Sequence, residues 1–441
     1  MFRDMKENSL NAIRTAFKAE LRELQQIPEL PEEGHWEYSR NAAGGWGGKF
    51  VPQPSFMNLH RVRRRNDEAA TGIEEALKKD FPEYLQLVGT PLSRGVLQPA
   101  SILHRLASEA YKRFGTFLLT DEQIEPILAD VSNFFDRKMV RLRLYAPALN
   151  LHGPRETPPI MFPGDIILKP MTDEECTRFY GGNPVFQVRQ MPVGFADFVF
   201  VKELEIPKLF GSHDEVQEDT IIKPFQEGLD FCMFALSTFK DAGAVGYDGI
   251  HITSAEFTLG FAFDGQHVYT GEHIPLSRFD LTPEEAPKIA AHAKAFEGIH
   301  STLEMASQRL VDSARRIKVR DTIVDAVIGL ESILLANTGD RTELRFRFSL
   351  HYASLFPKEE RKDAFYTARD LYDLRSTIAH GSSLKEEIKI NGKTLKVGDV
   401  AILARSVLRK TIGIFMPNAK NPDFMREGYW PSKDLGLEAD H

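Results

Sequence analysis

One stretch near the C-terminus of the chain reads Leu371-Tyr372-Asp373-Leu374-Arg375-Ser376-Thr377-Ile378-Ala379-His380-Gly381. It closes the segment 358–379, in which apolar side chains recur at helical spacing. A glycine directly after such a pattern is typical of a helix C-terminus. The stretch therefore predicts a helix that ends in an arginine, four further residues, a histidine and a glycine.

The sequence on both sides of this stretch is also helical and defines a C-terminal region of residues 283–441. An Asn-Gly pair at 391–392, flanked by alternating residues, predicts a small hairpin within it. Residues 342–355 fit either a strand or a helix, because their apolar residues alternate and also recur every four positions. The other helical patterns of this region cover residues 283–317, 321–336 and 397–414.

Two further regions precede it, and the three together predict an α+β protein. Residues 1–138 are mostly helical, but four prolines and a glycine run at 27–58 predict a loop there. Residues 139–282 form a β-rich α+β region with one helix near 225–240. The expected strands of this region are 140–144, 165–168, 186–189, 198–203 and 255–263.

The composition is that of an ordinary globular protein. Its 441 residues include 55 lysines and arginines and 63 acidic residues, so the formal charge is −8 and any contact with nucleic acid needs a local basic patch. Two cysteines are too few for a disulfide framework or a cysteine zinc site. The charged N-terminus does not fit a signal peptide, and the apolar runs are too short to span a membrane. We therefore expect a cytoplasmic protein with no membrane partner.

Several common site motifs are absent or incomplete. Gly48-Lys49 is followed by Phe50, whereas a phosphate-binding loop needs a serine or threonine at that position. The histidines lack metal-ligand spacing and there is no nucleophile elbow, so we expect no metal site and no cofactor. The basic run 60–65 fits either a contact with phosphates or a solvated helix face that Asp67 and Glu68 balance.

Arg375 and His380 carry the most informative chemistry of the chain. Arginine offers a planar, permanently charged fork that matches phosphate oxygens. Histidine titrates at about pH 6.5 and can transfer protons near neutrality, and RNA supplies its own nucleophile in the 2′-OH. The pair is thus sufficient for RNA cleavage without a metal ion. The simpler alternative is that Gly381 only ends the helix and that His380 is a favourable cation at its C-terminus.

In its wider context this stretch resembles the Apea-like branch of the HEPN superfamily (higher eukaryotes and prokaryotes nucleotide-binding). The resemblance begins in the apolar segment 323–335, which contains Glu331, continues through the arginine-rich segment 343–348 and ends in the Arg-x4-His-Gly stretch. These segments match in order and spacing, and the resemblance covers residues 300–420. Residues 164–175 look, less specifically, like the regions that often precede this domain.

The resemblance implies an all-α HEPN helical bundle at 283–441 that forms a homodimer, with residues 342–355 helical. It implies a metal-independent endoribonuclease and a defence or toxin-like effector, in which Arg375 grips the scissile phosphate of RNA and His380 acts as acid or base. Family members often carry Asn, Asp or His directly after the arginine, and this chain has the small Ser376 instead. The alternative is a non-catalytic HEPN dimerisation module or a module that binds RNA or nucleotides. The sequence identifies no partner or antitoxin protein.

Helix geometry constrains how this pair can act. At about 100° per residue, Arg375 and His380 lie about 140° apart on a continuous helix. They form a compact site only if the helix ends near Ala379 or if a second copy of the chain completes it. Asp373 and Ser376 are possible supporting residues near the histidine.

Glu331 is a polar residue in an apolar run and needs a partner if it is buried. An ion pair with Arg375, Arg345 or Arg347 would supply that partner and would make Glu331 either structural or an orienting residue for Arg375. Arg341, Arg345 and Arg347 are also candidate contacts to RNA.

Overall fold

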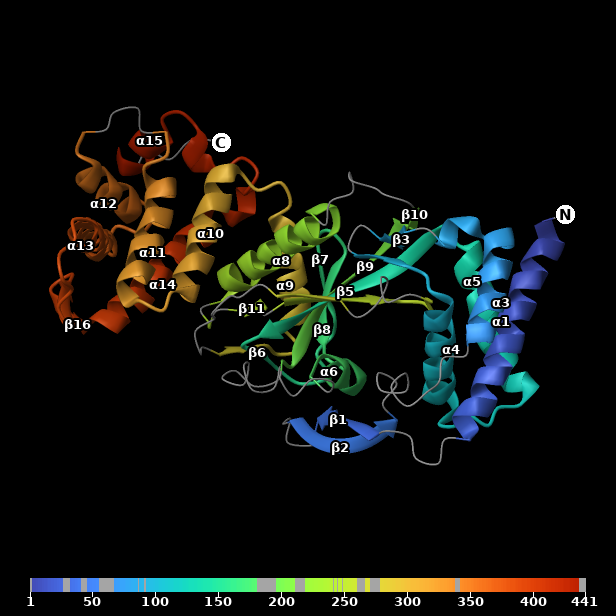
Figure 1. Ribbon diagram of the computed structural model, residues 1–441. Helices are drawn as coiled ribbons and strands as arrows, with labels where there is room; N and C mark the ends of the chain where they lie inside the picture. Colours follow the sequence, from blue (N-terminus) through green and yellow to red (C-terminus); the bar gives the residue numbers. More distant parts are fainter. Residues whose placement is uncertain are drawn as a thin grey trace.

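The computed structural model arranges the chain in three parts that follow one another along the sequence (Figure 1). N-terminal helices lie at one end, strands and helices lie in the middle, and C-terminal helices lie at the other end. The expected α+β class is confirmed. The described residues are 2–26, 32–40, 46–54, 67–85, 87–90, 93–180, 196–210, 219–240, 242–243, 245–247, 249–259, 266–269, 278–337 and 342–435.

The N-terminal region is a helical layer whose apolar faces pack on one another. Ile13, Phe17 and Leu21 recur at helical spacing in the first helix and are buried. A reciprocal capping box between Thr120 and Gln123 begins the last helix of the layer. The elements are α1 (Phe2–Gln25), β1 (Glu32–Arg40), β2 (Trp46–Pro54), α3 (Asp67–Asp80), the 3-10 turn η1 (Pro82–Leu85), β3 (Leu87–Thr90), β4 (Ser93–Val96), α4 (Pro99–Phe114) and α5 (Asp121–Asp136).

The prediction of a loop at 27–58 is wrong for the residues that the structure describes there, because they form two strands. β1 and β2 pair as an antiparallel hairpin, with Glu32 opposite Pro54 and Arg40 opposite Trp46. Prolines are tolerated because this two-stranded ribbon consists of edge strands, and packing against the central sheet overrides the local turn preference. The basic run 60–65 lies outside the described residues.

One buried carboxylate fixes this hairpin to the central sheet. The Arg40 guanidinium pairs with Asp197 at 3.0 Å, and it donates to the carbonyl of Gly153 at 2.9 Å. Trp46 Nε1 donates to the other oxygen of Asp197 at 3.3 Å, and His152 Nδ1 lies 3.1 Å from the same oxygen that Arg40 contacts. Because both Asp197 oxygens are bonded, the cost of burying its charge is offset.

The central sheet is antiparallel, with strand order β13-β12-β5-β9-β8-β7 and β11 also paired with β5. Its longest pair aligns Met139 of β5 with Pro207 of β9. Helix α8 covers one face so closely that a Cβ at Gly228 would lie 2.4 Å from Ile166 Cδ1. The elements are β5 (Met139–Leu149), β6 (Leu151–His152), β7 (Ile160–Phe162), β8 (Ile166–Pro170), α6 (Asp173–Tyr180), β9 (Phe198–Pro207), β10 (Leu209–Phe210), α8 (Asp219–Phe239), β11 (Gly246–Tyr247), β12 (Gly249–Ser254), β13 (Gln266–Tyr269) and β14 (Phe279–Asp280).

Three of the five expected strands, at 140–144, 165–168 and 198–203, correspond to parts of β5, β8 and β9. The expected strand 255–263 is wrong where the structure describes it, because β12 ends at Ser254. The strand that pairs with β5 lies before residue 255, and its apolar residues Ile250 and Ile252 are buried. Residues 186–189 lie outside the described residues.

The C-terminal region is helical except for the small hairpin that the sequence predicts. The single helix expected over 283–317 is two helices, and Gly298 lies between them with φ +73°. The ambiguous stretch 342–355 contains a helix. The elements are α9 (Ala286–Ala295), α10 (Ser301–Arg315), α11 (Val319–Leu334), α12 (Leu344–Ser354), α13 (Arg361–Ala379), β15 (Glu387–Ile390), β16 (Lys393–Lys396), α14 (Val397–Phe415), the 3-10 turns η3 (Met416–Asn418) and η4 (Asp423–Met425), and α15 (Tyr429–Leu435).

Helices α10, α11 and α14 form the centre of this bundle. Gly329 permits their close approach, because a Cβ there would lie 2.7 Å from Leu408 Cδ2 and 3.0 Å from Arg309 Cβ. The tight contact explains a glycine in the middle of a helix, where it is otherwise unfavourable.

Lys208, which follows β9, is a buried amine where the central sheet meets the N-terminal helices. Only 7% of its surface is exposed, and its Nζ lies 4.0 Å from the centre of the Phe134 ring. Nζ donates to the Phe134 carbonyl and to the Tyr84 hydroxyl. Burial, with a smaller contribution from Arg137, lowers the pKa of the Lys208 ammonium to about 7.

We expect Lys208→Met to stabilise the protein by about 1–3 kcal/mol at pH 6–7. The folded-state pKa of Lys208 lies below its unfolded value of about 10.4, so the unfolded chain binds more protons between these values and stability rises with pH. The advantage of methionine should therefore shrink as the pH approaches about 10. Urea titrations of parent and variant at several pH values measure this, and a pH-independent difference would contradict it.

Candidate active site

The Arg-x4-His-Gly stretch occupies the C-terminal end of α13, as the sequence predicts. His380 is the capping residue, and Gly381 takes the left-handed conformation with φ +80°. Its backbone N–H donates to the Ile378 carbonyl at 3.0 Å, and Ser382 N–H donates to the Thr377 carbonyl at 3.2 Å. These bonds satisfy carbonyls of the last turn, so the glycine does end the helix.

Arg375 is anchored by Glu331 on α11. Its Nη2 lies 3.2 Å from Glu331 Oε2, and the two side chains are 30% and 19% exposed. The structure thus selects Arg375 from the three partners that the sequence allows for Glu331. Glu331 Oε1 and Arg375 Nε have no hydrogen-bond partner among the described residues. The ion pair therefore leaves one acceptor atom of Glu331 and one donor atom of Arg375 without a hydrogen bond to the described residues.

Burial also shifts the acid–base balance around this ion pair. It raises the pKa of the Glu331 carboxyl, and the Arg375 guanidinium opposes that shift only in part. The pKa of the neighbouring Tyr372 phenol is raised as well, first by burial and then by the Glu331 charge. Burial therefore destabilises the charged form of the Glu331 carboxylate that Arg375 faces.

His380 lies apart from this pair. Its side chain is exposed and makes no hydrogen bond or ion pair with the described part of the chain. α13 does end at Ala379, but His380 caps it with φ −82° and stays on the helical path, so Arg375 and His380 still lie about 140° apart around the axis. The helix end therefore does not bring the two side chains together within one copy, which leaves completion by a second copy of the chain.

The supporting residues named from the sequence do not converge on His380. Asp373 pairs with Arg345 of α12, so its carboxylate faces the neighbouring helix. Ser376 is half-buried, and its backbone carbonyl accepts from the His380 N–H at 3.1 Å. Of the proposed supporting residues, Glu331 contacts the pair through its side chain, which pairs with Arg375, and Ser376 contacts His380 through its backbone.

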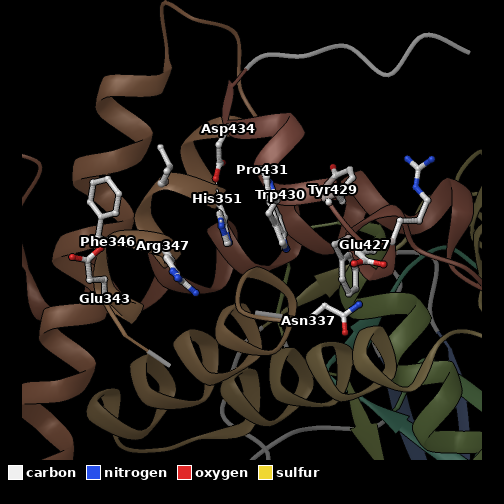
Figure 2. Close-up of a pocket in the computed structure, with 14 residues that line it drawn as sticks. Asn337, Glu343, Phe346, Arg347, His351, Glu427, Tyr429, Trp430, Pro431 and Asp434 are labelled. Atoms are coloured by element: carbon white, nitrogen blue, oxygen red, sulfur yellow. Dashed lines mark ion pairs between the residues drawn. The ribbon is translucent and has the colours of Figure 1, made fainter. Parts of the chain in front are cut away.

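The candidate RNA-contacting arginines do not form one patch. Arg345 lies towards α13, whereas Arg347 lines a cavity on another side of α12 (Figure 2). Arg345 and Arg347 are two positions apart, which is about 200° around a helix, so their side chains leave α12 on different sides. Arg341 lies outside the described residues.

Sequence reasoning missed the clamp that positions α11. Asp325 is 4% exposed, and it accepts from Arg309 Nη1 at 2.9 Å and from Arg316 Nε at 2.6 Å. Arg309 belongs to α10 and Arg316 ends it, so the clamp fixes the turn between α10 and α11. An aspartate among the apolar residues of this helix is a sequence signal for a buried ion pair, but its two partners depend on how the helices pack.

Comparison with protein-family models, with curated proteins and with solved structures finds no match to this chain. Within the described residues there is no cluster of three or more His, Cys, Asp or Glu side chains that could hold a metal ion. No helix in this part of the chain is long and apolar enough to cross a membrane.

Proposed function

We propose that the chain is a metal-independent endoribonuclease of the HEPN type that acts as a defence or toxin-like effector. The observation that carries this proposal is the end of α13, where Arg375 is anchored by a carboxylate and an exposed imidazole follows at the helix terminus. Arg375 keeps its guanidinium partly exposed, and His380 is free to reach a substrate. The resemblance to the HEPN superfamily supplies the expected chemistry for such a pair.

In the proposed reaction the 2′-oxygen of a ribose attacks the adjacent phosphorus, and the bond to the 5′-oxygen of the next nucleotide breaks. His380 acts as acid or base: it removes the 2′-OH proton or protonates the leaving 5′-oxygen. Arg375 balances the charge that develops on the phosphate oxygens. One product ends in a 2′,3′-cyclic phosphate, which becomes a 3′-phosphate where water then opens the ring, and the other product begins with a 5′-OH.

A non-catalytic module for dimerisation or for binding RNA or nucleotides is the second candidate function. It is favoured by the ion pair between Arg375 and Glu331, which occupies the guanidinium that would grip the phosphate. Exposure of His380, with no ion pair to the described residues, favours the enzyme instead. Only a cleavage assay separates the two.

We expect a two-fold symmetric homodimer built mainly from the C-terminal helices. The separation of Arg375 and His380 leaves the site of one copy incomplete, and a symmetry mate can bring the two ends of α13 to one cleft. Analytical ultracentrifugation at micromolar concentration measures the assembly. A monomer that nevertheless cleaves RNA would contradict this prediction.

RNA cleavage should survive EDTA and should require the 2′-OH. The purified protein is incubated with total RNA, and then with a defined RNA that carries one 2′-deoxy position at a mapped cut. We expect equal rates with and without chelator, and loss of the cut at the modified position. Loss of activity in EDTA with rescue by magnesium would contradict the mechanism, and no cleavage of any RNA would favour the binding module.

A further inference from the structure

A cavity of about 810 Å³ lies between α12 and the segment that leads into α15 (Figure 2). Its size is within the range of small-molecule sites. Arg375 and His380 do not line it, so the cavity is separate from the proposed active site. The chemistry of its own lining therefore decides what the cavity can hold.

The polar lining offers hydrogen-bond acceptors. Glu343 and Glu427 form no ion pair with the part of the chain that the structure describes. Asn337 Nδ2 donates to the Met425 carbonyl at 2.7 Å, which leaves the amide oxygen of Asn337 as a further acceptor. A ligand that carries donors can therefore bond to two carboxylates and one amide oxygen.

The donors of the lining are engaged or buried. Arg426 pairs with Asp423 at 3.2 Å, and Arg347 also has a partner. Trp430 is 4% exposed, and its ring stacks on the His351 ring with centres 4.4 Å apart, so its indole lies inside the cavity wall. Because both guanidiniums have partners whereas the two glutamates form no ion pair with the described residues, the lining favours a cationic ligand over an anionic one.

The two glutamates lie on different sides of the cavity, and each has an aromatic residue on its own side. Figure 2 shows Glu343 and Phe346 on the side of α12, and Glu427 and Tyr429 on the opposite side. Phe346 is 51% exposed, so its ring is open to a ligand. An exposed ring attracts an ammonium group and also packs against methylene groups. The lining thus provides two separate places for positive charge.

We propose that this cavity binds a polyamine, a flexible chain of methylene groups that carries an ammonium group at each end. An ammonium group has three donors and no acceptor, which matches a carboxylate without a partner. The methylene groups match the apolar surface between the two sides. A metal cation or a monoamine reaches one carboxylate at a time, whereas a polyamine reaches both. The proposal does not rest on RNA cleavage.

Isothermal titration calorimetry of the full chain with spermidine tests the proposal. We expect saturable binding with a dissociation constant of about 10–100 μM. Butylamine, which has a single ammonium group, and Mg²⁺ at matched ionic strength should each bind about tenfold or more weakly than spermidine. Added NaCl should weaken spermidine binding, because exposed charges are screened by salt.

Charge-removing variants test the two places separately. Glu343→Gln and Glu427→Gln should each weaken spermidine binding about tenfold, and the double variant about a hundredfold, because the two carboxylates bind different ammonium groups and act independently. Glu359→Gln, the same change at an exposed residue outside the cavity, is the matched control and should bind as the parent does.

Four results would overturn the proposal. The first is no saturable heat with spermidine at about 1 mM, and the second is equal affinity for spermidine and either Mg²⁺ or butylamine. The third is Glu343→Gln and Glu427→Gln proteins that bind spermidine as tightly as the parent. The fourth is a double variant no weaker than either single variant, which would mean that both carboxylates contact the same charge.

Discussion

Arg375→Ala and His380→Ala are each expected to slow RNA cleavage by about a hundredfold or more. Arg375→Lys should also be poor, because an ammonium keeps the charge but loses the planar fork. Rates are measured on a defined RNA by gel. Arg369→Ala is the matched control, since Arg369 lies on the same helix and its guanidinium contacts Asp370 and the Tyr366 ring rather than Glu331.

Loss of the arginine also changes stability in a way that depends on pH. Without Arg375, Glu331 keeps its burial but loses its cation, so its already raised pKa rises further. A carboxyl whose folded-state pKa exceeds the unfolded value loses stability as the pH rises through the folded pKa. We therefore expect Arg375→Ala to be closer to the parent in stability near pH 5 than near pH 8.

The double variant Arg375→Ala with Glu331→Gln separates structure from catalysis. Removing the carboxylate should restore stability near pH 8, whereas cleavage should stay lost because the phosphate still lacks its arginine. Recovery of cleavage in the double variant would show that Arg375 matters only to the fold. A His380→Ala protein that cuts RNA as fast as the parent would show that the end of α13 is a helix cap and nothing more.

Asp325→Ala should lower the free energy of unfolding by about 2–3 kcal/mol. The change leaves two guanidiniums side by side without the carboxylate that they share. Breaking a buried ion pair costs about 3–5 kcal/mol, but Arg309 and Arg316 are 36% and 47% exposed and regain water, which reduces the cost. Asp325→Asn retains the shape and one acceptor and should cost less.

Asp321→Asn is the control for this change, because it removes an aspartate one turn earlier on α11. Asp321 pairs with Arg320 at the surface, with side chains 40% and 63% exposed, so the expected loss is below about 0.5 kcal/mol. Urea unfolding followed by tryptophan fluorescence measures each variant. Equal losses at the two positions would mean that the clamp between α10 and α11 contributes no more than a surface ion pair.

The local sequence pattern was sufficient to predict secondary structure wherever a segment's own residues decide its conformation. The helix over 358–379, its end at a glycine, the Asn-Gly hairpin and the final helix at 397–414 all lie close to their predicted positions. It was insufficient where distant contacts compete with local preference. The β1–β2 hairpin forms in a segment rich in proline and glycine because Arg40 and Trp46 meet Asp197, some 150 residues later.

The sequence by itself determined the candidate pair, Arg375 and His380, because spacing along a helix and the chemistry of two side chains can be read without coordinates. Only the tertiary structure decided that Arg375 is the cation that faces Glu331 and that Asp373 pairs with Arg345. It also decided that Arg347 lines a separate cavity. Each of these depends on the rotation of one helix against another. The apolar pattern of a helix restricts that rotation to a face, and the packing of the neighbouring helices then fixes it.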